Sequence, residues 1–220
     1  MSYYEMIEEH IRQIVRERQI QEVLHFTRLE RLGGILEYGI LGKSDLLDRG
    51  FEVFDRMDKS EDSVSVSISC YYPDMFWAKR NGAQNQPWII LTLHPSLLWQ
   101  YHCLFFRRGV PTSESQNQSG KRFGGFALEA LFDDASFSLD PDEPSFRDKH
   151  SLPPSWPTFS DAEVQVKSPI APNYIKAAVV ENPDLVDTVR EIFRAAGREE
   201  CEVVVQPFDP RIDGKPFRWG

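Results

Sequence analysis

The stretch "VLHFTRLERLGGILEYGI", residues 23–40, decides how the fold begins. A short apolar run ends in the polar residues His25 and Thr27, and an amphipathic segment follows at once. Residues two apart on a strand share one face, so both polar side chains point the same way. Apolar residues then recur at helical spacing as far as Gly39, a typical helix end. The stretch therefore predicts a strand that presents polar groups, followed by an amphipathic helix.

The rest of the chain alternates between the two kinds of element. Serine alternates with β-branched residues in "SVSVSIS", a period-two strand. A buried strand that runs into a short turn or helix is predicted at 87–99, further strands at 162–166, 176–180 and 201–207, and helices at 4–20, 123–132 (with Phe126, Ala130 and Leu131 facing inward) and 182–197. Without a repeat or an evident linker, the order predicts one compact α+β domain over residues 1–220. Long polar loops are expected at 109–122 and 133–160, and loops of that length are usually functional or mobile.

Composition narrows the class of protein. With 220 residues, 41% of them hydrophobic, the chain can bury a real core. No apolar run approaches the roughly 18 residues that a membrane span needs, and the charged N-terminal segment does not resemble a secretory signal. The three cysteines are widely spaced, which indicates neither a disulfide framework nor a zinc site. These features favour a cytoplasmic protein that does not associate with a membrane.

Charge also bears on the partners. The formal net charge of -9 argues against coating of nucleic acid by the whole surface. A local basic groove remains open, with candidates at Lys79–Arg80, Arg107–Arg108 and Lys121–Arg122. Such pairs are also common on ordinary solvated surfaces, and both interpretations stand at this point.

Two polar features exceed what a core requires. Ser65, Ser67 and Ser69 share one face of their strand, where small side chains leave room for a flat ligand. Glu163 lies at the entry of an apolar strand after a long loop, where a carboxylate can act as a base or stabilise positive charge. The alternatives are a solvated sheet face and an edge-strand glutamate that discourages aggregation. No phosphate-loop, dinucleotide, zinc-protease or hydrolase motif is present, and the five histidines lack metal-ligand spacing.

Five segments resemble, in order, the DarT family of NAD-dependent ADP-ribosyltransferases, toxins that attach ADP-ribose to bases in single-stranded DNA. The segments are "LHFTRLERLGGILEYGIL", "DRMD", "SVSISCYYPDMFWAKR", "WIILTLHPSLLW" and "PTFSDAEVQVKSPIAPNYI". The resemblance covers about residues 22–180, and residues 181–220 add a C-terminal helix and strand. It implies an ADP-ribosyltransferase fold in which helices flank a split central sheet.

The resemblance also implies roles for individual residues. Glu163 matches the catalytic glutamate, and Arg56 matches an arginine that assists by meeting phosphate or orienting the base. The remaining matches imply contacts to NAD, the ADP-ribose donor, from His25, Phe26, Thr27, Ser67, Ser69, Met75, Phe76 and Arg80. No metal is implied. The two long loops would border the acceptor groove, and a macrodomain antitoxin that removes the modification is an expected partner in a toxin–antitoxin or antiphage system.

The sequence departs from the family pattern in two places. Asp74 stands where a lysine is common, and "FRRGVPTSES" replaces an Asn-Ala-Ala run. Both segments border the NAD pocket or the acceptor site, so the target can differ while the chemistry persists. DNA is the favoured acceptor, and RNA or a protein is the alternative acceptor. A further alternative is that the chain is a non-catalytic module of the same fold that binds NAD or nucleic acid.

Overall fold

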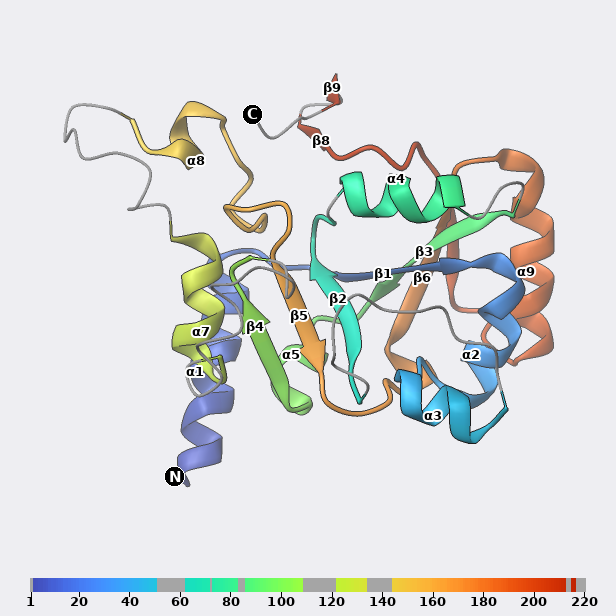
Figure 1. The fold of residues 1–220 in the computed structure, drawn as a ribbon, viewed down its shortest axis with the longest axis horizontal. Coiled ribbons are helices and arrows are strands. Elements are labelled where there is room, and N and C mark those ends of the chain that lie inside the picture. The colour runs from blue at the N-terminus through green and yellow to red at the C-terminus, as the bar shows by residue number, and fades with distance from the viewer. Residues whose placement is uncertain are drawn as a thin grey trace.

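The protein folds around a seven-stranded sheet (Figure 1). The computed structural model describes residues 2–50, 62–71, 73–82, 86–108, 122–133, 144–212 and 215–216. Its strand order is β4-β5-β2-β1-β3-β6-β7, and every neighbouring pair is antiparallel except β6 and β7. The strands are β1 (Val23–Arg28), β2 (Val64–Ile68), β3 (Trp88–Leu93), β4 (Cys103–Phe106), β5 (Glu163–Val166), β6 (Ile175–Val180) and β7 (Glu202–Val205), with a separate pair β8 (Arg211–Ile212) and β9 (Lys215–Pro216).

Helices pack around this sheet. The α-helices are α1 (Tyr3–Glu17), α2 (Leu32–Tyr38), α3 (Lys43–Asp48), α4 (Pro73–Gly82), α5 (Leu97–Gln100), α7 (Gly125–Glu129), α8 (Phe146–Lys149) and α9 (Val186–Ala195). Short 3-10 turns are η1 (Leu29–Arg31), η2 (Ala130–Phe132), η3 (Pro172–Tyr174) and η4 (Pro183–Leu185). In Figure 1, α1 and α7 lie beside the β4 end, and α9 lies at the opposite end. None of the helices within these described ranges has the length and apolar character required to cross a bilayer.

The sheet is split between β1 and β2. These two strands pair only at Val23–Ile68 and Leu24–Ser67, whereas β1 pairs with β3 along all six of its residues. Beyond Leu24 the two strands separate, and the sheet divides into a β4-β5-β2 half and a β1-β3-β6-β7 half. The expected α+β class with a split central sheet is therefore confirmed.

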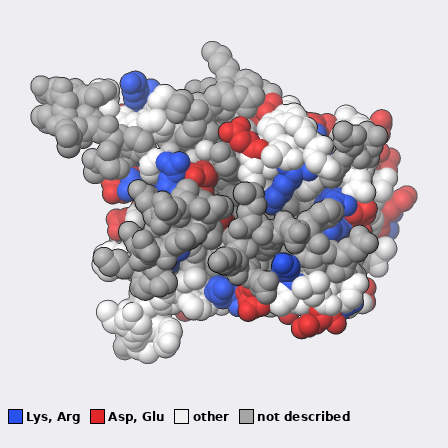
Figure 2. Space-filling model, viewed as in Figure 1, with Lys and Arg blue, Asp and Glu red and all other residues white. Residues whose placement is uncertain are grey.

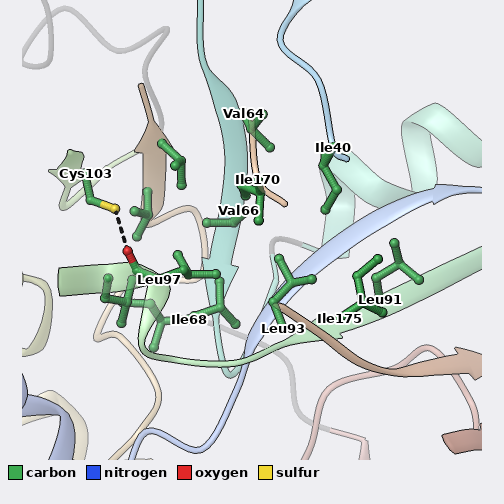
Figure 3. Close-up of a cluster of buried hydrophobic side chains, with 14 of the residues drawn as sticks. Ile40, Val64, Val66, Ile68, Leu91, Leu93, Leu97, Cys103, Ile170 and Ile175 are labelled. Atoms are coloured by element: carbon green, nitrogen blue, oxygen red, sulfur yellow. Dashed lines mark hydrogen bonds between the residues drawn. The ribbon is translucent and has the colours of Figure 1, made fainter. Parts of the chain in front are cut away.

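The main core lies on one face of the sheet, and alternation along the strands explains why. In β2 the branched residues Val64, Val66 and Ile68 are buried, while Ser65 and Ser67 are partly exposed on the other face. Figure 3 shows the branched side chains of β2 meeting those of β3, β6 and the helix α5. There the Cys103 thiol donates to the carbonyl of Leu97 over 3.5 Å.

A second, aromatic core lies on the opposite face beneath α4. Phe76 at its centre is 0% exposed. Its ring centroid lies 4.9 Å from that of Phe26, 5.2 Å from Tyr71, 5.7 Å from Trp88 and 5.5 Å from Phe208. The helix α4 is thus fastened directly above the β1 side of the split.

Most predicted elements are present, with one correction. Gly39 ends α2 with φ of 89°, and Asn182 caps the turn before α9, as expected. The inward orientation predicted for Phe126 is wrong, because its side chain is 80% exposed. The reason is the close approach of α7 to α1: a Cβ on Gly125 would lie 2.2 Å from Nδ1 of His10. Gly125, Ala127 and Leu128 therefore face inward instead, which leaves Ala130 exposed as well.

Candidate active site

Glu163 is connected to both halves of the split sheet by a short chain of hydrogen bonds. The Ser65 hydroxyl on β2 donates to Oε1 of Glu163 on β5 over 2.6 Å. Nδ1 of His25 on β1 lies 3.1 Å from the main-chain carbonyl of the same Ser65. A carbonyl oxygen only accepts, so the His25 proton in this bond resides on Nδ1. One serine therefore links the candidate carboxylate to the histidine across the split.

Strand register explains why Ser65 and Glu163 meet. Ser65 pairs with Gln165, so the side chain of Glu163, two residues along β5, lies on the same face as both. Across the other ladder Glu163 pairs with Phe106 of β4. Glu163 itself is half-buried, and an ion pair between Asp161 and Arg108 ties the loop before it to the segment just after β4. A carboxylate on a rigid strand between two neighbours has little freedom to reorient.

The two predicted polar faces lie on opposite sides of the sheet. Leu24 pairs with Ser67, so these two side chains share a face, and His25 and Thr27 point to the other one. Thr27 is buried beside Ile89, its partner on β3. His25 and Thr27 share one face of β1, and Ser65 and Ser67 share one face of β2, as predicted. His25 meets the serine strand at the main-chain carbonyl of Ser65, across the split.

Ser69 occupies a strained position where β2 ends. Its φ of 53° is unusual for a residue with a side chain. Its amide donates to the carbonyl of Glu22 over 3.3 Å, while its Oγ is buried and finds no hydrogen-bond partner among the described residues. The nearby Tyr71 hydroxyl is buried in the same way, without a partner in the described part of the chain, and burial raises the pKa of this phenol. Strain and unsatisfied hydroxyls are typical of ligand-binding positions.

Three of the residues expected to contact NAD lie on α4, and their surroundings differ from one another. Met75 is 38% exposed, whereas Phe76 has no exposed surface to offer a ligand. Arg80 forms an ion pair with Glu181 at 2.8 Å, and its guanidinium lies over three aromatic rings of the second core. In this arrangement Arg80 fastens α4 to the end of β6. Arg56 lies outside the described residues, as do residues 109–121 and 134–143 of the two long loops.

The loop that leads into Glu163 is held by two arginines. Arg147 on α8 donates to the carbonyls of Trp156 and Pro153 over 2.7 and 2.9 Å. Arg108, just after β4, forms an ion pair with Asp161 at 3.0 Å. These contacts were not predicted, because no local pattern in the sequence indicates which carbonyl or carboxylate an arginine will meet. Ser65 was singled out by the serine alternation but not selected as a site residue.

Charges on the described surface are mixed. Figure 2 shows Lys and Arg interspersed with Asp and Glu, without one large basic field on the face shown. Within the described ranges, no three His, Cys, Asp or Glu side chains are grouped to hold a metal ion. In the described part of the chain, hydrogen bonds link His25, Ser65 and Glu163 beside the split, and Ser67 lies on the same strand at the last pair before it.

Comparison with known proteins adds a family match. The model described as ssDNA thymidine ADP-ribosyltransferase, DarT, matches residues 24–210. Thermus sp. 2.9 DarT in complex with carba-NAD+ has a TM-score of 0.59 at 16% identity, covering 86% of this chain and 96% of that chain. The same protein in complex with ADP-ribosylated ssDNA gives 0.54 at 16% identity, covering 86% and 95%. Thermosipho africanus DarTG in complex with ADP-ribose gives 0.51 at 11% identity, covering 84% and 50%. No curated protein sequence matches.

Proposed function

The chain belongs to the DarT family of ssDNA thymidine ADP-ribosyltransferases, and on that premise we propose that Glu163 is its catalytic carboxylate. Family membership confirms the resemblance found in the sequence, the enzyme class and NAD+ as the ADP-ribose donor. The observation that carries the proposal is the 2.6 Å hydrogen bond from Ser65, which fixes this carboxylate beside the split.

The proposed reaction breaks the bond between nicotinamide and ribose. The bonding electron pair leaves with nicotinamide, and positive charge develops at the anomeric carbon. A fixed carboxylate stabilises that charge more strongly in a dry site than in water. A nitrogen of the acceptor base then forms the new bond to the anomeric carbon, and its proton passes to Glu163. Glu163 therefore serves first as an electrostatic stabiliser and then as a base.

The surrounding residues suit a nucleotide donor. His25 keeps a proton on Nδ1 in its bond to the Ser65 carbonyl, which fixes the orientation of its ring beside the split. Ser67 lies on the same strand as Ser65, and Ser69, whose hydroxyl has no partner among the described residues, follows the end of that strand; both provide small polar contacts. We assign donor binding to His25, Ser67 and Ser69 together with the exposed Met75, and keep Arg56 as a proposed assistant. Phe26, Thr27, Phe76 and Arg80 support these residues from within the packed structure.

The test compares wild-type protein with Glu163→Gln, using NAD+ and mixed single-stranded DNA and RNA oligonucleotides. Mass spectrometry detects the added ADP-ribose. We expect modified DNA with wild type only, and NAD+ affinity within a few fold in both proteins, because the lost stabilisation belongs to the transition state. Glu202→Gln on β7 is the matched control and should transfer normally. Wild-type rates in Glu163→Gln would refute the assignment.

Acceptor identity is resolved in the same experiment. Modified RNA without modified DNA would assign an RNA acceptor. Unmodified oligonucleotides with NAD+ still bound would favour a protein acceptor, and loss of both transfer and NAD+ binding would favour a binding module. We expect DNA, as in the family.

We also propose a biological setting. The protein acts in the cytoplasm as the toxin of a toxin–antitoxin or antiphage system, and a macrodomain protein reverses its modification. The structural likeness to DarTG supports this proposal. Co-expression with a macrodomain that hydrolyses ADP-ribosylated DNA should restore growth of cells that express wild-type protein. Glu163→Gln should be harmless without it.

A further inference from the structure

Arg122 lies beside the residue that faces Glu163. Its guanidinium carbon is 4.3 Å from the centroid of the Phe106 ring. Phe106 is buried and pairs directly with Glu163 across the β4-β5 ladder. Paired residues on a ladder have Cβ atoms about 5 Å apart and share one face of the sheet, so the Arg122 cation stacks on the direct neighbour of the candidate carboxylate.

Among the described residues, Arg122 has no acidic partner, unlike Arg107 and Arg108. Arg107 donates to the carbonyl of Asp133, and Arg108 forms an ion pair with Asp161. In the part of the chain that the structure describes, the Arg122 guanidinium makes a cation–π contact with the ring of Phe106. Partial burial lowers the pKa of Arg122, which reflects lost hydration of its cation. A partly dehydrated cation without a counterion is ready to bind an anion.

The strand order separates Arg122 from the donor site. The Arg122 carbonyl accepts from the Phe105 amide over 2.8 Å, and Phe123 bridges to Leu104, so this segment follows the outer edge of β4. The split lies beyond β5 and β2, on the other side of Glu163. At about 4.8 Å per strand, the edge and the split are more than 10 Å apart. A donor in the split and an anion at Arg122 therefore approach Glu163 from opposite sides.

We propose that Arg122 binds a backbone phosphate of the single-stranded nucleic acid acceptor. Stacking on Phe106 presents the planar guanidinium, whose forked donors match phosphate oxygens. This inference rests on the proposed function, since it assigns the acceptor side of the same carboxylate. It adds a specific phosphate contact to a protein whose net charge is -9.

Binding of a thymidine-containing single-stranded DNA oligonucleotide, measured by fluorescence anisotropy without NAD+ over a salt series, tests the proposal. Each phosphate contact to a single strand contributes about 0.7 to the slope of log affinity against log salt. We expect Arg122→Gln to lower that slope by about 0.7 and to weaken binding several-fold at low salt. Arg122→Lys keeps the charge and should keep most of the slope.

Two controls make the result specific. Arg190→Gln on α9 removes the same charge at the far end of the sheet and should leave the slope unchanged. NAD+ affinity of Arg122→Gln should stay within twofold of wild type. An unchanged slope in Arg122→Gln would overturn the proposal, and so would a loss of NAD+ affinity, which would place Arg122 at the donor diphosphate. Because no transfer is measured, this outcome is independent of the Glu163 test.

Discussion

Removing the Ser65 hydroxyl should slow transfer without abolishing it. In Ser65→Ala the 2.6 Å donor to Glu163 is lost while the β2-β5 ladder keeps its main-chain pairing. Hydrogen bonds to charged groups contribute about 1.5–3 kcal/mol. At 1.36 kcal/mol per tenfold change in rate, we expect a loss of about 10- to 150-fold in the rate of transfer. NAD+ affinity should change little, because the hydroxyl positions Glu163 and does not carry the donor.

A double-mutant cycle separates positioning from general damage. Single-turnover transfer is measured for wild type, Ser65→Ala, Glu163→Gln and the double variant, with thermal stability recorded for each. Ser65→Ala should add little to Glu163→Gln, since the carboxylate that the hydroxyl positions is already gone. Ser65→Thr retains a hydroxyl and should recover most of the activity. Equal rates in wild type and Ser65→Ala would show that the bond does not position Glu163, and the reasoning would fail.

Three further outcomes are expected. His25→Ala should weaken NAD+ binding, measured by calorimetry, more than it slows transfer at saturating NAD+; the reverse pattern would contradict a donor-binding role. Phe76→Ala should lower the free energy of unfolding in urea by about 3–5 kcal/mol, because the ring is fully buried among four others. Burial raises the pKa of the Cys103 thiol to about 12 and also raises those of Cys70 and Cys201. Native protein at pH 8 should therefore react slowly with a thiol reagent, and all three thiols should react after unfolding; rapid reaction of the native protein would disprove their burial.

Local patterns in the sequence were sufficient for much of the fold. Serine alternation predicted β2 because one face of that strand is buried and the other is not. The helix after β1 followed from its apolar spacing and from Gly39. By contrast, α4 was not predicted, because its aromatic residue Phe76 packs in a second core whose members come from distant parts of the sequence. The orientation of Phe126 was wrong because it depends on how closely α7 approaches α1.

The site required contacts that only tertiary structure provides. Residues 65 and 163 are 98 positions apart, and no local rule predicts that they meet. The sequence showed that His25 and Thr27 share a face, but not that the serines of β2 lie on the other one, since this depends on register. Likewise, the ion pair between Arg80 and Glu181 joins distant segments. Resemblance to a family supplied Glu163 and His25 as candidates, and the structure supplied the serine that connects them.

The early end of pairing between β1 and β2 creates an edge inside the sheet. Main-chain amides and carbonyls normally lack strand partners at the outermost strands, where they attract other chains. Here, beyond Leu24 and Ser67, the main-chain groups of β1 and β2 no longer pair with each other, and the His25 ring already bonds to one of them. Recognition through peptide groups is insensitive to side-chain identity. A binding site built this way tolerates extensive sequence drift, consistent with a fold shared at 16% identity.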